Sequence, residues 1–348
     1  MRRRTFLKGF AAAATAASAG PLIVTDRTIA QTRTIYVNTW GGSWTAAEEA
    51  AFFKPFTDQT GIRVKTVAPV SYAKLKAQVQ SGNYEWDITA ITQAELLRAE
   101  REGLVEPVDW TVVKKEKLFP NAVYANGLAY CALGTNLAYR KDKFPQGGPK
   151  TWADFWDVKK FPGNRSMLNN AVRTVQFALV ADGVAVDKVF PLDIDRAFRK
   201  LDQIKGNIAV WWGAGAQPPQ LLKDNEVQYA ASYSGRVAGQ PGITITYAQG
   251  LLDLAYFVVP KGANPAEKAA AMGLLHEMSV ARNQAVAAEV VPYTGPSPQL
   301  DALLPQARLA EFPTTTANKA MQAQGNPEWW AQNRDAAERR WQEFKLGL

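Results

Sequence analysis

The pattern of apolar and polar residues predicts a strand, a helix and a second strand at the start of the chain. Residues 34–40 have the β-branched and aromatic content of a strand, and residues 62–67 alternate between apolar and polar side chains. The helix between them has an apolar face made of Phe52, Phe53 and Phe56. Thr45 and Glu48 have the spacing of a capping box. A strand, helix and strand within about 35 residues indicate a βαβ unit.

The alternation of strands and helices continues to the C-terminus. Further strands are predicted at residues 86–91, 207–212, 227–232, 243–247 and 254–259, and further helices at 74–80, 152–156, 171–181 and 194–204 and from Asn264 and Asn326 onward. The last helix carries an apolar stripe that we interpret as a packing surface, formed by Trp330, Ala337, Trp341 and Phe344. This order predicts an α/β fold with mixed sheets flanked by helices. The chain has 348 residues, and the roughly 318 that follow residue 30 exceed what one core usually serves, so we expect two lobes.

The first residues have the layout of a cleaved export signal. Residues 2–8 (RRRTFLK) are rich in basic side chains, and residues 11–19 are mostly small and apolar. Residues 3–8 match the main positions of the twin-arginine (Tat) consensus, whose pathway exports folded proteins. A retained membrane anchor is less favoured, because the apolar run is shorter than a spanning helix needs. We predict a Tat signal peptide over residues 1–30, with cleavage after Ala19 or Ala30.

The net charge gives little support to a nucleic-acid partner. The formal charge of the whole chain is +8. Residues 1–30 contain five basic side chains and one acidic side chain, so their removal lowers the formal charge to +4. No cluster of Lys and Arg or RNA-binding motif accompanies this mild excess. We therefore expect no nucleic-acid partner.

The sequence contains few residues suited to metal binding or nucleophilic catalysis. Cys131 is the single cysteine and lies in an apolar segment, where a buried, inert thiol is expected. His276 is the single histidine and lies in a predicted helix without neighbouring Cys or His ligands. Gly-x-Ser-x-Gly, P-loop and His-Glu-x-x-His motifs are absent. We expect no catalytic residue, metal or cofactor.

Two strand ends combine tryptophan with glycine and are candidate parts of a ligand site. In open α/β sheets, ligands bind beyond the carboxyl ends of the strands. Residues 40–45 (WGGSWT) include Trp40, Gly41 and Ser43 just before a helix, and Trp212 precedes a similar glycine-rich turn. Aromatic faces would contact an alkyl stem or a cation. The alternative is a turn flanked by core tryptophans.

Charged and polar side chains at other strand ends complete the candidate ligand site. Arg173 falls in the first turn of a predicted helix, and Arg236 follows a strand; either guanidinium could bind a carboxylate. Asp253 precedes an apolar strand and could bind an amine, and Thr92 ends the strand at residues 86–91. The alternatives are solvated arginines and a turn-forming aspartate.

The order of several segments resembles the bacterial extracellular solute-binding proteins, and within them the spermidine/putrescine-binding type. The segments are an opening strand ending in Trp40, followed by residues 56–64 (FTDQTGIRV), 86–88 (WDI), 102–105 (EGLV), 134–136 (GTN) and 259–263 (VPKGA). This resemblance implies a type II periplasmic-binding-protein fold, in which two α/β lobes enclose a ligand cleft and are joined by a hinge that the chain crosses twice. It also implies a periplasmic, monomeric protein that binds a small molecule and docks on the inner-membrane permease subunits of an ABC importer.

The resemblance further implies a division of the chain into lobes. Lobe one comprises residues 31–135 plus 257–312, and lobe two comprises residues 136–256. The C-terminal helices, residues 313–348, pack on the lobes. The closing of the lobes on a ligand would then be the functional motion.

One departure from the polyamine-binding pattern changes the expected ligand. Polyamine binders place carboxylates at the start of the helix that here begins with Asn169, Asn170 and Arg173. A guanidinium in place of a carboxylate inverts the local field and favours a ligand with an anionic group. We therefore predict a carboxylate-bearing or zwitterionic ligand, such as the ω-amino acid γ-aminobutyrate (GABA), with a polyamine as the alternative.

Two more distant alternatives belong to other functional classes. A periplasmic enzyme on a two-lobe scaffold would need a general base near a nucleophile, which the lone His276 does not offer. An iron-binding receptor of the same fold would need paired tyrosines, and no Tyr-Tyr pair occurs in the chain.

Overall fold

The computed structural model describes residues 33–115 and 117–347. The predicted signal peptide at residues 1–30 therefore lies outside the described residues. The strands are β1 (Thr34–Asn38), β2 (Arg63–Val67), β3 (Ile88–Thr92), β4 (Val123–Tyr124), β5 (Gly127–Arg140), β6 (Arg165–Leu168), β7 (Ile208–Trp212), β8 (Tyr229–Tyr233), β9 (Ile243–Val258) and β10 (Ala323–Gln324).

Helices precede or follow most of these strands. The α-helices are α1 (Ser43–Glu48), α2 (Lys54–Thr60), α3 (Tyr72–Ser81), α4 (Gln93–Arg101), α5 (Trp152–Trp156), α6 (Ala171–Ala181), α7 (Ile194–Ile204), α8 (Gln217–Lys223), α9 (Ser234–Val237), α10 (Pro265–Ser279), α11 (Ala281–Val290), α12 (Leu300–Leu303), α13 (Thr316–Ala320) and α14 (Pro327–Lys345). A π-helical segment, η1 (Glu49–Phe53), joins α1 to α2, and the 3₁₀ segments are η2 (Pro120–Ala122), η3 (Lys141–Lys143), η4 (Val186–Lys188), η5 (Lys205–Asn207) and η6 (Gln306–Glu311). Among the described residues, none of the helices combines the length and the apolar character that a membrane crossing requires.

The strands form one mixed sheet in the order β2-β1-β3-β9-β5-β8-β6-β7. β1 pairs in parallel with β2 and β3, so the predicted βαβ unit at the start of the chain is confirmed. At the other end of the sheet, β6 pairs in parallel with β7 and β8. Most candidate residues lie at the carboxyl ends of these parallel strands or in the segments that follow them, whereas Asp253 lies within the antiparallel strand β9.

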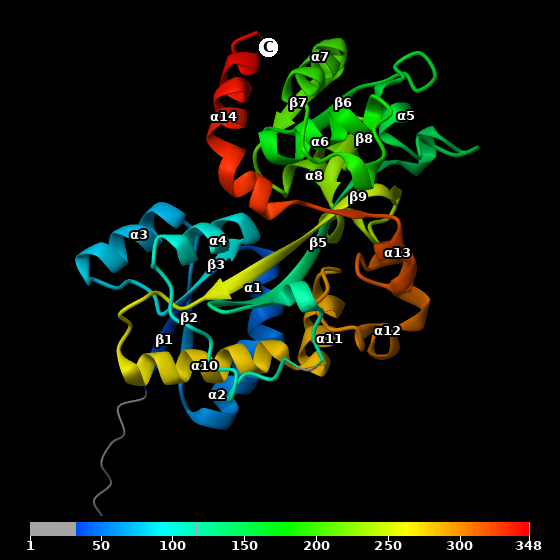
Figure 1. The fold of residues 1–348 in the computed structure, drawn as a ribbon. Coiled ribbons are helices and arrows are strands. Elements are labelled where there is room, and N and C mark those ends of the chain that lie inside the picture. Colours follow the sequence, from blue (N-terminus) through cyan, green and yellow to red (C-terminus); the bar gives the residue numbers. More distant parts are fainter. Residues whose placement is uncertain (1–32, 116, 348) are drawn as a thin grey trace, which may run out of the picture. The chain divides into compact units, whose positions relative to one another are not determined.

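Two long antiparallel strands, β5 and β9, connect the two ends of the sheet. Figure 1 shows them running side by side from the part that holds β1–β3 to the part that holds β6–β8. The pairing register of β5 and β9 shifts between Thr135 and Leu137. At this point the Asn136 side chain packs against Gly134 and Gly250. A Cβ atom would lie 2.2 Å from the Asn136 amide group if it were added to Gly134, and 2.0 Å from it if added to Gly250. The register shift therefore requires glycine at both positions.

The prediction of two separate strands at residues 243–247 and 254–259 was wrong. Both segments belong to the single strand β9, which continues through residues 248–253. The less apolar stretch around Gln249 and Gly250 suggested a break, but the ladder with β5 spans it. Gln249 adopts a positive φ of 60°, which accommodates the register shift without ending the strand.

Two large hydrophobic cores lie at the two ends of the long strands. One contains buried side chains around β1, β3 and α10, such as Ile35, Phe52, Ile88, Phe257 and Leu275. The other lies around α5, α6, α7 and α14, with Trp152, Phe177, Phe198, Trp341 and Phe344. The two-lobe α/β fold class is therefore confirmed, and the predicted apolar stripe of α14 is buried in the second core.

The chain makes an additional pass between the two cores near its C-terminus. β10 pairs in parallel with β9, with Ala323 opposite Leu251 and Gln324 opposite Leu252. The resemblance had implied a hinge crossed twice, by the strands corresponding to β5 and β9. The segment between α13 and α14 adds a further connection alongside them.

Several predicted helix starts are confirmed, and one is not. The side chains of Asn170, Asn264 and Asn326 accept hydrogen bonds from backbone amides in the first turns of α6, α10 and α14. The capping box predicted from Thr45 and Glu48 is absent, because α1 begins at Ser43 and its N-cap residue is Gly42, with a φ of 66°. The Glu48 carboxylate instead accepts a hydrogen bond from Thr39.

Candidate functional site

Two of the candidate residues, Ser43 and Arg236, line a hollow of about 260 Å³. The hollow is lined by residues from both sides of the long strands: Ser43, Ala216, Pro219, Lys223, Gly235, Arg236, Gln240, Val290, Val291 and Pro292. Two of these side chains, Lys223 and Arg236, are cationic, and none is acidic. A volume somewhat below the range typical of drug-sized ligands suits a small solute with a negative group.

Arg236 is the best-placed group for binding an anion. Its Nη1 donates a hydrogen bond to the Ser43 Oγ at 2.8 Å, which brings together two predicted site residues from opposite sides. Its Nε is buried and has no hydrogen-bond partner among the described residues. A buried guanidinium N–H without an acceptor costs free energy that a ligand carboxylate would recover.

Two tyrosines and two glycines surround Arg236. An added Cβ on Gly215 would lie 2.9 Å from the Tyr233 ring and 3.8 Å from the Arg236 Nε, so both side chains lie against this glycine. The neighbouring Tyr293 ring lies against Gly235. Burial raises the pKa of the Tyr293 phenol, and the charge of Arg236 offsets part of that rise. Tyr293 thus remains a neutral donor beside the guanidinium at physiological pH.

Arg173 and Asp253 form an ion pair with each other. The Nε and Nη2 of Arg173 lie 3.0 and 2.8 Å from the same carboxylate oxygen, Oδ2 of Asp253. The guanidinium also lies over the Tyr233 ring, with its carbon 5.4 Å from the centroid. Burial lowers the pKa of Arg173, but its interactions with the Asp253 carboxyl and the Tyr233 phenol outweigh the effect of burial and hold the pKa above its ordinary value. The two side chains are therefore each other's partners in this structure, although the prediction had assigned each to a ligand group.

The two predicted tryptophans have different environments. The Trp40 side chain is 43% exposed, and its Nε1 donates a hydrogen bond to the Tyr130 hydroxyl at 3.0 Å. Trp40 can therefore present an aromatic face to a ligand. Trp212 is only 3% exposed, donates to the Ala231 carbonyl at 2.9 Å, and packs edge-on against Tyr233 at 5.3 Å. In this structure, Trp212 is a buried packing partner of Tyr233.

Gly41 and Thr92 have local structural roles. Gly41 has a φ of 81°, and a Cβ there would lie 3.3 Å from the Cβ of Ala68, so the turn after Trp40 requires glycine. The Thr92 hydroxyl accepts a hydrogen bond from the Glu95 amide and donates one to the Glu95 carboxylate. These bonds, with that from the Thr92 amide to the same carboxylate, form a capping box at the start of α4.

We expect Thr92→Ala to lower the stability of the protein without weakening ligand binding. Loss of the cap should reduce the free energy of unfolding by about 1 kcal/mol, measured by urea denaturation. Ligand affinity, measured by calorimetry, should stay within about twofold of the wild type, a difference of under about 0.5 kcal/mol. A large loss of affinity at unchanged stability would instead place the Thr92 hydroxyl in contact with the ligand.

A buried acid lies beneath the aromatic residues of the site. Glu48 is fully buried, and its Oε2 accepts a hydrogen bond from the Thr39 Oγ1 at 2.6 Å, while its Oε1 has no partner among the described residues. Burial raises the pKa of the Glu48 carboxyl to about 8, and the Thr39 hydroxyl offsets only part of the rise. Glu48 therefore carries its proton at neutral pH. It lies next to Tyr130, the hydrogen-bond partner of Trp40.

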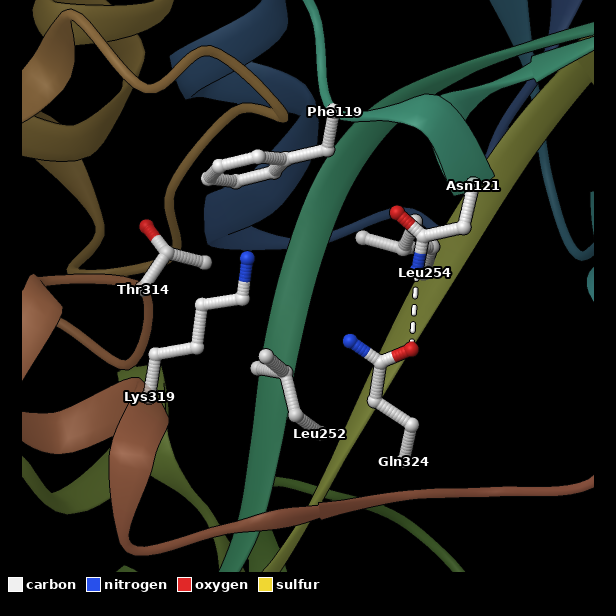
Figure 2. Close-up of a pocket in the computed structure, with 7 residues that line it drawn as sticks. All are labelled: Phe119, Asn121, Leu252, Leu254, Thr314, Lys319 and Gln324. Atoms are coloured by element: carbon white, nitrogen blue, oxygen red, sulfur yellow. Dashed lines mark hydrogen bonds between the residues drawn. The ribbon is translucent and has the colours of Figure 1, made fainter.

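A second, much smaller cavity lies along β9, beside the C-terminal segment. Figure 2 shows Lys319 directed toward the Phe119 ring and Asn121 bonded to Gln324. The Lys319 ammonium lies 3.5 Å from the ring centroid. A volume of about 10 Å³ holds at most one water molecule, so this cavity cannot contain a solute. It contributes to the packing of β9 against the segment that contains β10.

Within the described residues, no group of three or more His, Cys, Asp or Glu side chains is arranged to hold a metal ion. Cys131 is buried, as predicted, and burial raises the pKa of its thiol well above the ordinary value. His276 lies in α10.

Sequence reasoning overlooked Tyr233 and Tyr293 as site residues. Tyr233 lies between Arg173, Trp212 and Gly215, and Tyr293 lies against Gly235 and packs edge-on against Trp44 at 5.6 Å. Tyr233 ends β8 and precedes Arg236 by three residues, and this position at a strand end could have identified it as a site residue. Tyr293 lies in an irregular segment, and only the fold brings it to the site.

The chain is similar to several known proteins over most of its length. A family profile described as bacterial extracellular solute-binding protein matches residues 51–333. A gamma-aminobutyric acid-binding protein of Pseudomonas aeruginosa is 36% identical over 324 residues, covering 89% of this chain and 90% of that protein.

Two solved structures agree with this similarity. An ABC transporter substrate-binding protein from Bradyrhizobium japonicum has a TM-score of 0.84 and 35% identity, covering 90% of this chain and 99% of that one. A GABA receptor has a TM-score of 0.83 and 32% identity, covering 90% of this chain and 97% of that one. A spermidine/putrescine-binding periplasmic protein of Haemophilus influenzae is more distant, with 27% identity over 60% of this chain and 59% of that protein.

Proposed function

Because the chain belongs to the bacterial extracellular solute-binding proteins, we propose that it captures a small carboxylate-bearing zwitterion and delivers it to the permease subunits of an ABC importer. Family membership agrees with the prediction of a periplasmic binding protein and not an enzyme. An ω-amino acid such as GABA is the ligand class that we favour.

The observation that carries this proposal is the buried Nε of Arg236, which has no hydrogen-bond partner in the described part of the chain and belongs to a hollow lined by cationic, polar and apolar side chains. A ligand carboxylate could accept hydrogen bonds from this guanidinium and from Ser43. Both contacts of Arg173 with the Asp253 carboxylate use Oδ2, so its second oxygen, Oδ1, could bind an ammonium group. The exposed face of Trp40 would pack against the alkyl chain between the two charges.

Similar proteins support the same ligand class. Both the Pseudomonas aeruginosa relative and one of the solved structures are named for binding GABA, at 36% and 32% identity. The polyamine-binding relative is more distant, and its ligand would bring a second cation toward Arg236 and Lys223. A polyamine remains the alternative that the ligand experiment must test.

Closure of two lobes around the ligand would couple binding to transport. We propose the predicted division for the bulk of each lobe, residues 31–135 plus 257–312 and residues 136–256. We place the hinge near Asn136 in β5 and near Gly250 in β9, because the register shift and the glycine contacts coincide there. The hydrogen bond from Arg236 to Ser43 would be one of the contacts made on closure.

The remaining parts of the proposal concern export and assembly. We propose that residues 1–30 direct the folded protein through the Tat pathway and are removed after Ala19 or Ala30. We propose that the mature protein acts as a monomer and does not bind nucleic acid. Mass spectrometry of the protein purified from the periplasm would identify its first residue.

We expect GABA or a related ω-amino acid to raise the melting temperature of the mature protein. At a concentration a hundredfold above the dissociation constant, a ligand stabilises the folded state by about 2.7 kcal/mol, or roughly 5 °C for a chain of this size. The panel should contain ω-amino acids, α-amino acids, dicarboxylates and polyamines. A shift confined to putrescine or spermidine would support the polyamine alternative, and no shift with any compound would contradict the proposed ligand class.

A further inference from the structure

The ion pair between Arg173 and Asp253 occupies the only carboxylate among the predicted site residues. Asp253 lies in β9 opposite Leu133 of β5, close to where the long strands pass between the two cores. Arg173 reaches it from the first turn of α6 with two N–H groups that share one carboxylate oxygen. The arginine and aspartate side chains are only 15% and 31% exposed, so solvent screens the pair weakly.

The position of Arg173 is determined by several independent contacts. Its backbone amide donates to the Asn170 side chain at the start of α6, and its guanidinium lies over the Tyr233 ring. Tyr233 is in turn packed against Trp212. The guanidinium is therefore held against Asp253 by a rigid aromatic support, which distinguishes it from a mobile surface arginine.

From this arrangement we infer that Arg173 is a specificity-determining residue, which neutralises Asp253 and thereby prevents the site from binding a diamine. The inference rests on the proposed function and concerns the same site. With Arg173 present, Asp253 has a compensated charge and one free oxygen, which is enough to orient a single ammonium group. Without Arg173, the carboxylate would carry a full uncompensated charge in a weakly screened position and would attract a dication much more strongly.

The other charged side chains of the site also disfavour the binding of a diamine. Arg236 and Lys223 line the hollow, and the hollow has no acidic lining residue. A diamine would therefore meet one neutralised carboxylate and two cations, whereas a zwitterion places its carboxylate near those cations. Exclusion of an unwanted ligand by like charges is as effective a source of specificity as attraction of the correct one.

Two variants that remove the charge of Arg173 test the inference. Arg173→Met retains an apolar stem to pack on Tyr233, and Arg173→Gln retains hydrogen-bonding capacity, so either folded variant suffices. Calorimetric titration with putrescine should show an affinity at least about tenfold higher than that of the wild type, an effect of about 1.4 kcal/mol. Adding Asp253→Asn to the same variant should abolish the gain, because the carboxylate is the group that Arg173 neutralises.

A matched control is the half-buried ion pair between Arg196 of α7 and Asp182, the C-cap residue of α6. Arg196→Met removes a charge of the same kind and should leave putrescine binding at the wild-type level. If Arg173→Met and Arg173→Gln bind putrescine no better than the wild type, Arg173 does not control specificity and the inference fails. This outcome is separate from failure of the proposed ligand class, which is measured on the wild type with ω-amino acids. A gain of putrescine binding that persists with Asp253→Asn would also overturn the inference.

Discussion

Replacing Arg236 with alanine is expected to weaken the binding of an ω-amino acid by about two orders of magnitude. Removal of one partner from a buried, hydrogen-bonded charge pair costs on the order of 3 kcal/mol, which corresponds to about a hundredfold in the dissociation constant. The effect should be large because the buried Nε of Arg236 has no hydrogen-bond partner among the described residues and its Nη1 donates to the Ser43 hydroxyl. Isothermal titration calorimetry with the ligand identified in the panel would measure the loss.

Two further variants show whether the loss is specific to this guanidinium. Ser43→Ala removes only one neutral hydrogen-bonding group and should weaken binding by about tenfold. Arg199→Ala removes an exposed arginine of α7 and should change the affinity by less than about twofold, or 0.5 kcal/mol. If Arg236→Ala and Arg199→Ala bind the ligand equally well, the carboxylate site is elsewhere in the cleft.

Glu48→Gln is expected to stabilise the protein at neutral and alkaline pH but not in acid. The pKa of the Glu48 carboxyl is about 8 in the folded protein against an ordinary value of 4.5, so the folded state binds its proton more tightly than the unfolded chain does. Stability is therefore fully present below pH 4.5 and falls as the pH rises toward about 8. At pH 7 the ionisable side chain costs about 3 kcal/mol, which glutamine would recover.

The measurement is chemical denaturation of the wild type and the variant at several pH values between 4 and 9. The two stability curves should converge near pH 4 and separate steadily up to about pH 8. Glu49→Gln is a matched control, because Glu49 is adjacent in sequence but exposed, and its pH dependence should follow the wild type. Parallel curves for the wild type and Glu48→Gln would show that Glu48 is ionised in the folded protein at neutral pH.

The buried acid and the ligand site share part of their structure. Glu48 lies next to Tyr130, which accepts the hydrogen bond of the exposed Trp40 indole. A neutral carboxyl group at this position avoids placing a fixed negative charge beneath the aromatic face that we assign to the ligand. Because the Glu48→Gln variant preserves this neutrality, we expect it to bind ligand as the wild type does below pH 8.

Local signals in the sequence predicted most of the elements and several strand-end residues. The helices at residues 171–181 and 194–204 coincide with α6 and α7, because their apolar periodicity and their starts are encoded within each segment. The Asn-Pro starts of α10 and α14 are local for the same reason. Ser43, Arg173 and Arg236 were recognised because each lies between a strand and a helix or in the first turn of a helix, and strand ends are where α/β folds bind ligands. Asp253 was recognised because it precedes the strand predicted at residues 254–259, although the structure places it within β9.

Only the tertiary structure decided how those residues are paired. The sequence by itself determined the α/β class, the helix caps and the presence of arginines at strand ends, since these depend on neighbours a few residues away. It could not show that Arg173 pairs with Asp253 across 80 residues, that Arg236 bonds Ser43 across 193, or that Glu48 faces inward toward Thr39. Such contacts depend on how strands are ordered in the sheet and on which side chains are removed from water, and both are set by the packing of the whole chain.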